Sequence, residues 1–106
     1  MEDDKYAVIL ARRADNMLIA HIDFLAQVSP SAARNLYADF NKSMILLSKN
    51  PFRQPFADEL DATGIPANTY RKKIFYNGYK ALYIIENTTV YVDAIIDCRQ
   101  ENKNLY

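Results

Sequence analysis

The spacing of hydrophobic residues changes along the chain, and each change predicts a different element. Residues 5–11 (KYAVILA) are apolar on both alternations, as in a strand that is covered on both faces. Between about Ala14 and Gln27 the apolar residues recur every three or four positions, which predicts an amphipathic helix. A second helix is expected from Pro30 to near Asn50, because Ser29 is a suitable N-cap and proline is favoured in the first turn. The short link makes these helices an antiparallel hairpin.

Three strand-like runs follow in the second half of the chain. They cover about Tyr70 to Tyr76, Tyr79 to Glu86 and Val90 to Asp97. Asn77-Gly78 predicts a tight hairpin between the first two runs, because both residues tolerate positive φ. The second hairpin is expected to turn at Asn87-Thr88. Strands joined by such short turns form an antiparallel meander.

The segment between the second helix and these strands, Pro51 to Ala67, has the least regular pattern. It contains three prolines and one glycine, so it predicts a long loop, with one helical turn around Phe56 to Leu60. The element order is therefore strand, helix, helix, strand, strand, strand. This order predicts an α+β fold in a single domain, residues 1–106, in which a helical hairpin covers one face of a sheet.

Charge is unevenly distributed, although 13 Lys and Arg residues balance 13 Asp and Glu residues over the chain. From Asn68 to Tyr83 there are four basic residues and no acidic one, which indicates a local surface for a polyanion such as RNA or DNA. The alternatives are a solvated basic face or one that pairs with an acidic protein. The single cysteine, Cys98, excludes an internal disulfide, and no apolar run approaches the ~20 residues of a membrane span. A cytoplasmic protein without membrane contact is expected.

Several motifs resemble those of the RelE/ParE superfamily of bacterial type II toxins. They are the SPSAA link between the helices, the Asn-Pro after the second helix, the run YRKKIFYNGYKALYII and a last strand ending in IIDCRQ. The resemblance covers nearly the whole chain and implies a RelE/ParE-like toxin held in a hetero-oligomer by its cognate antitoxin. RelE-like members cleave mRNA on the ribosome, whereas ParE-like members inhibit DNA gyrase and lack the catalytic residues.

In the RelE-like branch, cleavage uses basic residues on the sheet and a tyrosine near the C-terminus. The positions of this sequence that match that pattern, and are therefore catalytic candidates by resemblance, are Arg71, Lys73, Lys80, Arg99 and Tyr106. Lys80 stands where arginine is common, and an ammonium group cannot grip phosphate with two parallel hydrogen bonds as a guanidinium does. Tyr106 lies one residue further from Arg99 than the pattern has.

The candidates also suggest a chemistry. Residues two apart on a strand point to the same side, so Arg71 and Lys73 are expected to converge on one phosphate on the open sheet face, with Lys72 pointing away. Fixed cations stabilise the charge that develops on phosphorus when RNA is cleaved without a metal. A lysine among other cations is a candidate general base, which would be Lys73, with Tyr106 or a second cation serving the leaving group.

No cofactor and no metal site are expected. Asp93 and Asp97 lie four residues apart on one strand, but no His or Cys ligand is near them in sequence, so salt bridges to Arg71 or Arg99 are expected instead. The only histidine, His21, borders the apolar stripe of the first helix and is expected to have a structural role.

The sequence favours a ribosome-dependent mRNA endoribonuclease, because the basic pair Arg71 and Lys73 occurs together with Arg99. Two alternatives are a ParE-like inhibitor of DNA gyrase without catalytic residues and a decayed toxin that only binds its antitoxin; the neutral net charge and the displaced Tyr106 favour these. In each case the antitoxin is expected to dock on the helical hairpin and on an exposed sheet edge, because both helices are apolar over a broad face.

Overall fold

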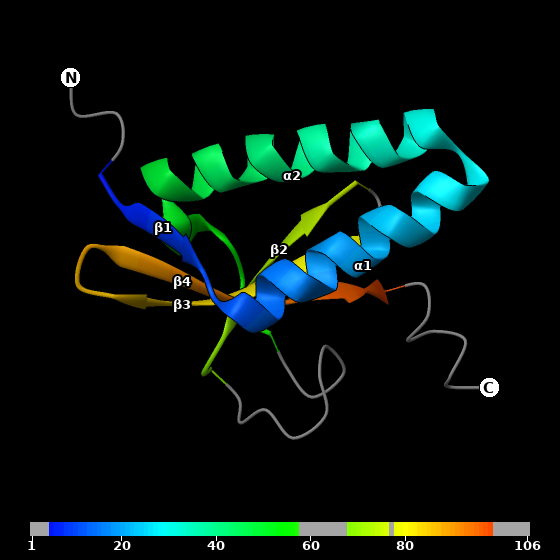
Figure 1. Cartoon of the computed structure of the whole chain (residues 1–106). Coiled ribbons are helices and arrows are strands. Elements are labelled where there is room, and N and C mark those ends of the chain that lie inside the picture. Colours follow the sequence, from blue (N-terminus) through cyan, green and yellow to red (C-terminus); the bar gives the residue numbers. More distant parts are fainter. Residues whose placement is uncertain (1–4, 58–67, 77, 99–106) are drawn as a thin grey trace.

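The computed structural model describes residues 5–57, 68–76 and 78–98, which form the α+β arrangement that the sequence predicts (Figure 1). The elements in chain order are β1 (Ala7–Leu10), α1 (Arg12–Val28), α2 (Pro30–Lys49), the 3₁₀ helix η1 (Pro51–Arg53), β2 (Arg71–Phe75), β3 (Tyr79–Glu86) and β4 (Thr89–Asp97). Within the described residues, neither helix is long and apolar enough to cross a membrane.

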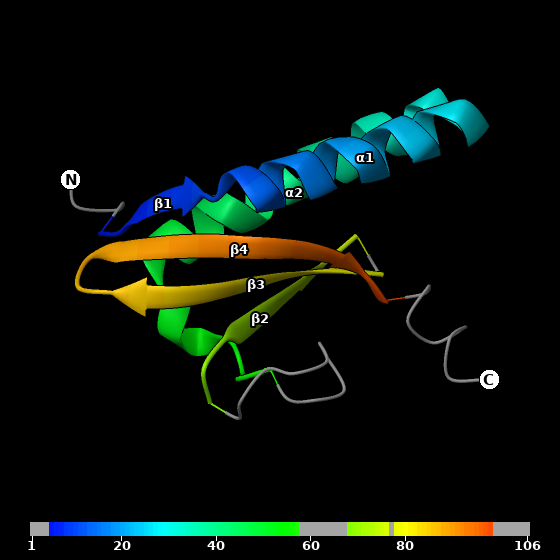
Figure 2. The ribbon, with the colours of Figure 1, turned by 60° about the horizontal axis from the view of Figure 1, so that its bottom comes forward.

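The four strands form one sheet in the order β1-β4-β3-β2. The last three strands make the predicted antiparallel meander, and β1 joins it by pairing parallel to β4. A parallel pair needs a crossover connection, which the α1–α2 hairpin supplies, so both helices lie on the same side of the sheet (Figure 2). The predicted fold class is confirmed.

The link between the helices has the predicted cap. The Ser29 hydroxyl accepts a hydrogen bond from the backbone N–H of Ala32 at 3.2 Å, and Pro30 occupies the first turn of α2. This bond satisfies one of the amide groups that a helix start leaves without a partner. A single serine therefore ends one helix and begins the next.

The core lies between the helical hairpin and the sheet. Leu18 of α1 and Leu36 and Leu47 of α2 are buried against inward-facing residues of β3 and β4, among them Tyr83 and Val92. Toward the β2–β3 hairpin, Phe40 of α2 meets Phe75 of β2 edge to face, with ring centroids 5.6 Å apart. Burial of these large side chains is the main driving force that holds the helices on the sheet.

Strand β2 ends one residue earlier than predicted, whereas β3 begins at Tyr79 as predicted. Strand pairing ends at Phe75 and Tyr79, so Tyr76 belongs to the turn, where its φ is 48°, and not to the strand. The Tyr76 N–H donates to the Asp39 carboxylate of α2 at 2.6 Å. Its hydrogen-bond partner is therefore a side chain of α2 and not a carbonyl of β3. Asn77 lies outside the described residues. The Asn87-Thr88 turn is confirmed between the paired residues Glu86 and Thr89.

The prediction of a helical turn from Phe56 to Leu60 is wrong for Phe56 and Ala57, the residues of that range that the structure describes. The helical turn comes earlier, at Pro51–Arg53, and Phe56 instead forms an isolated antiparallel bridge with Arg71. The Ala57 N–H donates to the Tyr70 carbonyl, and the Lys72 N–H donates to the Pro55 carbonyl. The segment is extended because it covers the outer edge of β2, whose amide groups need partners. Residues 58–60 lie outside the described residues.

Candidate functional site

The basic stretch of β2 points alternately to the two faces of the sheet. Arg71, Lys73 and Phe75 pair with residues of β3 that belong to the core, and Phe75 itself packs on α2. Arg71 and Lys73 therefore share a face, but it is the face bordered by α2 and η1, not the open face that we expected. Lys72 and Ile74 point to the opposite face, on which Leu82 packs in a second buried cluster with Ala57 and Ala94. The physical reason is that Phe75, and not Ile74, is the residue of β2 that α2 buries.

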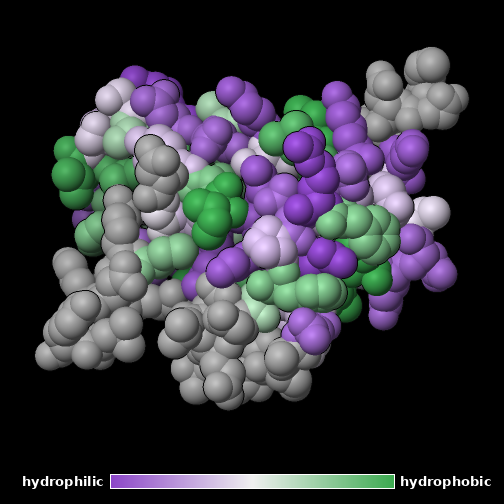
Figure 3. All heavy atoms as spheres, turned by 180° about the vertical axis from the view of Figure 1, so that it is seen from behind, coloured by the Kyte–Doolittle hydropathy of each residue, from purple (hydrophilic) through white to green (hydrophobic). Residues whose placement is uncertain are grey.

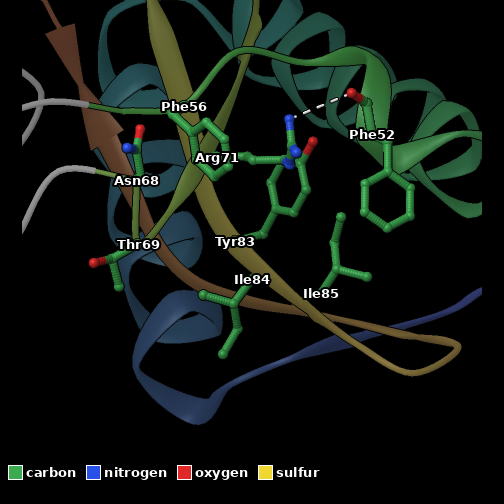
Figure 4. Close-up of a pocket in the computed structure, with 8 residues that line it drawn as sticks. All are labelled: Phe52, Phe56, Asn68, Thr69, Arg71, Tyr83, Ile84 and Ile85. Atoms are coloured by element: carbon green, nitrogen blue, oxygen red, sulfur yellow. Dashed lines mark hydrogen bonds between the residues drawn. The ribbon is translucent and has the colours of Figure 1, made fainter.

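The Arg71 guanidinium holds the segment that follows α2. Its Nη1 donates to the Gln54 carbonyl at 2.7 Å and to the Phe52 carbonyl at 3.3 Å, the second of which is drawn in Figure 4. Its Cζ lies 4.1 Å from the ring centroid of Phe56 and 5.4 Å from that of Phe52. Hydrogen bonds and cation–π contacts thus occupy the group on several sides. This is the environment of a structural arginine.

A pocket of about 220 Å³ surrounds this arginine. The Arg71 pocket, shown in Figure 4, is lined by Phe52, Phe56, Asn68, Thr69, Arg71, Tyr83, Ile84 and Ile85. At its base the buried Tyr83 hydroxyl donates to the Pro51 carbonyl at 2.6 Å. Burial raises the pKa of the Tyr83 hydroxyl above its usual value, and the positive charge of Arg71 acts weakly in the opposite direction. Tyr83 therefore stays neutral and serves as a hydrogen-bond donor.

Lys73 and Lys80 do not come together. Lys73 lines a second hollow, with Lys49 at the end of α2 and Arg53 of η1. Lys80 pairs with Ile74 across the β2–β3 ladder, so it shares the opposite face of the sheet with Lys72. Lys80 is only 2% exposed. Two of the five candidates thus lie on one face and a third on the other, while Arg99 and Tyr106 lie outside the described residues.

The tyrosine that begins the basic stretch has a partner that the sequence did not predict. The Tyr70 hydroxyl donates to the Asp93 carboxylate at 3.0 Å, while the Arg71 guanidinium donates to the Gln54 and Phe52 carbonyls. Arg99, the other partner expected for Asp93, lies outside the described residues. Burial, then the hydrogen bond to Asp93 and its negative charge, raise the pKa of Tyr70, and Arg13 opposes them. Asp93 could not be placed from alternation because a β-bulge interrupts the register of β4 at this point.

His21 has the structural role that we expected. Its Nε2 donates to the Ile95 carbonyl at 2.9 Å, and its ring meets Tyr79 edge to face at 5.3 Å. In the described ranges, no three His, Cys, Asp or Glu side chains gather into a group that could hold a metal ion.

Comparison with known proteins supplies a structural match but no match in sequence. No family model and no curated protein matches the chain. Among solved structures, the chain is similar to one from the chromosomal ParDE toxin–antitoxin system of P. aeruginosa, with a TM-score of 0.69 and 14% sequence identity. The match covers 89% of this chain and 97% of that chain. At this identity the likeness shows that the two chains share a fold.

Proposed function

We propose that this chain is the toxin of a type II toxin–antitoxin system and that it acts as ParE-like toxins do, by binding DNA gyrase without catalysis of its own. The observation that carries the proposal is the fold match to a chain of a ParDE system, which extends over nearly the full length of both chains. A fold alone does not decide function, so the remaining support must come from the residues at the candidate site.

The arrangement of the cations supports binding over catalysis. A catalytic cation must be directed at the position where charge develops in the substrate. The Arg71 guanidinium is instead directed at two backbone carbonyls and two phenylalanine rings. Lys73 and Lys80 lie on opposite faces of the sheet, where they cannot act on the same phosphate.

The helical hairpin supports the presence of an antitoxin. Both helices expose large apolar side chains, including Phe24 of α1 and Tyr37 and Ile45 of α2. Side chains of this size at the surface of so small a chain are typical of a contact with another protein. The hairpin is therefore the surface on which we place the neutralising partner.

Two reactions with the purified chain test the proposal. We expect the chain to inhibit DNA supercoiling by gyrase and to leave ribosome-bound mRNA intact in a translation reaction. Cleaved mRNA together with undisturbed supercoiling would overturn the gyrase proposal.

A second candidate function is ribosome-dependent cleavage of mRNA. The observation in its favour is that Lys72 and Lys80, on neighbouring strands, share the face of the sheet opposite to Arg71 and Lys73, with the Lys80 side chain 2% exposed. In this proposal Lys80, Arg99 and Tyr106 keep the roles that the resemblance gives them, and Lys72 replaces Arg71 and Lys73. The mRNA reaction above separates the two candidates, because only this one predicts new transcript ends that disappear when Lys80 is replaced.

A further inference from the structure

A second hollow, of about 550 Å³, lies where the end of α2, the η1 turn and β2 meet. This basic cleft is lined by Leu46, Lys49, Asn50, Arg53, Gln54 and Lys73. Three of these six described residues are cations and none carries a carboxylate. The cleft therefore has one sign of charge, although the chain as a whole is neutral.

The fold brings these cations together from three separate elements. Asn50 alone separates the end of α2 from Pro51, where η1 starts, so Arg53 follows soon after Lys49. Lys73 faces the same region because Phe75, two residues later on β2, packs against Phe40 of α2. Lys49 and Arg53 are exposed, so their charged ends can reach a ligand in the cleft.

Two hydrogen bonds, one buried and one partly buried, fix the walls of the cleft. The Gln54 carbonyl accepts from Arg71 at 2.7 Å, and the Pro51 carbonyl accepts from the buried Tyr83 hydroxyl at 2.6 Å. Both bonds tie the segment after α2 to the sheet. A ligand that enters the cleft does not have to order this segment, and preorganisation of this kind favours affinity.

We propose that the basic cleft binds an acidic peptide segment of the antitoxin; this identification of the partner rests on the proposed function. Clefts of this volume accommodate a few side chains. The 49% exposed Leu46 offers an apolar contact at the rim, as peptide sites commonly do. A partner docked along α2 would reach the cleft at the C-terminal end of that helix, so the cleft continues the hairpin surface.

The observations favour a peptide over a nucleic acid. Nucleic-acid-binding proteins usually carry a broad basic stripe and an excess of positive charge, because each phosphate contact adds to affinity. This chain has 13 basic and 13 acidic residues, and its described cleft gathers only three of the cations. On the far side of the molecule from Figure 1, hydrophilic side chains are interspersed with separate hydrophobic ones (Figure 3). Among the described residues, the positive charge of the cleft comes from Lys49, Arg53 and Lys73 alone, which suits a short acidic segment.

Nuclear magnetic resonance titration of the isotope-labelled full chain tests the proposal. The probe is a synthetic glutamate-rich peptide with occasional leucines; a version with alanine in place of glutamate and a single-stranded oligonucleotide of similar charge are titrated in parallel. We expect the glutamate-rich peptide to shift the resonances of the cleft residues, and the alanine version to leave them in place.

Matched double variants provide the control. Lys49→Gln with Arg53→Gln removes two cations of the cleft, whereas Arg34→Gln with Lys42→Gln removes two exposed cations of α2 that do not line it. The first pair is expected to weaken peptide binding by about tenfold or more, equivalent to about 1.4 kcal/mol. The second pair should leave the affinity for the peptide nearly unchanged. It lowers the net charge of the chain by the same amount as the first pair, but it removes no side chain that lines the cleft.

Three results would overturn the proposal: no binding of the glutamate-rich peptide, equal effects of the two double variants, or tighter binding of the oligonucleotide at the same residues. None of these readouts depends on toxicity. A chain that binds the peptide in the cleft but does not inhibit growth would refute the toxin proposal and leave the peptide site intact.

Discussion

Replacing Arg71 by alanine is expected to destabilise the fold, because the guanidinium connects β2 to the segment after α2. The change removes a charged hydrogen bond of 2.7 Å to the Gln54 carbonyl, a longer one to the Phe52 carbonyl and the cation–π contacts with Phe52 and Phe56. One good hydrogen bond to a charged group contributes about 1.5–3 kcal/mol. A cation–π contact at a partly exposed site adds about 0.5–1 kcal/mol.

Because Arg71 is only half-buried, we place the total loss near the lower end of these ranges, at about 2 kcal/mol. For a domain of this size that loss lowers Tm by about 10 °C. Thermal and denaturant unfolding of the purified variant measures it, with Lys42→Ala as the control, since an exposed cation of α2 should change stability by less than ~0.5 kcal/mol. Arg71→Lys should fall between the two, because an ammonium group cannot reach both carbonyls as a guanidinium does. If Arg71→Ala unfolded like the wild-type chain but lost growth inhibition, the structural account of Arg71 would be wrong.

Three further changes test other contacts. Tyr83→Phe leaves the buried Pro51 carbonyl without its donor and should lower stability by about 1–3 kcal/mol in denaturant unfolding; an unchanged midpoint would show that the bond contributes nothing. Because burial raises the pKa of Tyr83 in the folded chain, the unfolded chain releases its proton first as pH rises above 10, so stability should fall there, and less so in Tyr83→Phe. Ser29→Ala removes the N-cap of α2 and should cost about 1 kcal/mol, whereas Ser29→Gly should cost only a few tenths; equal losses would argue against a capping role.

The fold could be predicted because its elements follow strong local signals. The change in hydrophobic period marks the helices, Ser29-Pro30 marks the link between them, and the Asn87-Thr88 turn joins the last two strands. No local sequence pattern predicts the parallel pairing of β1 with β4. This pairing depends on the tertiary arrangement, in which the helical hairpin connects β1 to the rest of the sheet.

The candidate site was harder to predict because it depends on which face of β2 is buried. Alternation puts Arg71 and Lys73 on one face, but Ile74 and Phe75 are adjacent apolar residues, so the pattern cannot choose between the two faces. The choice is made by Phe40 of α2, which packs on Phe75.

The structural role of Arg71 was not visible in the sequence for a similar reason. Its partners come from residues 52–56, which the sequence shows only as an irregular, proline-containing segment. The bulge that sets the position of Asp93 is not marked by a glycine or proline in β4.

Inducible expression of this chain in a bacterium, with growth, DNA breaks and mRNA ends measured together, tests the central claim most directly. We predict that growth stops, that DNA breaks appear and that transcripts keep their normal ends. The double variant Lys73→Ala with Arg99→Ala should remain toxic, since the proposed action needs no catalytic cations. Growth arrest with new mRNA ends, abolished in a folded double variant, would contradict the account and identify the chain as a ribonuclease.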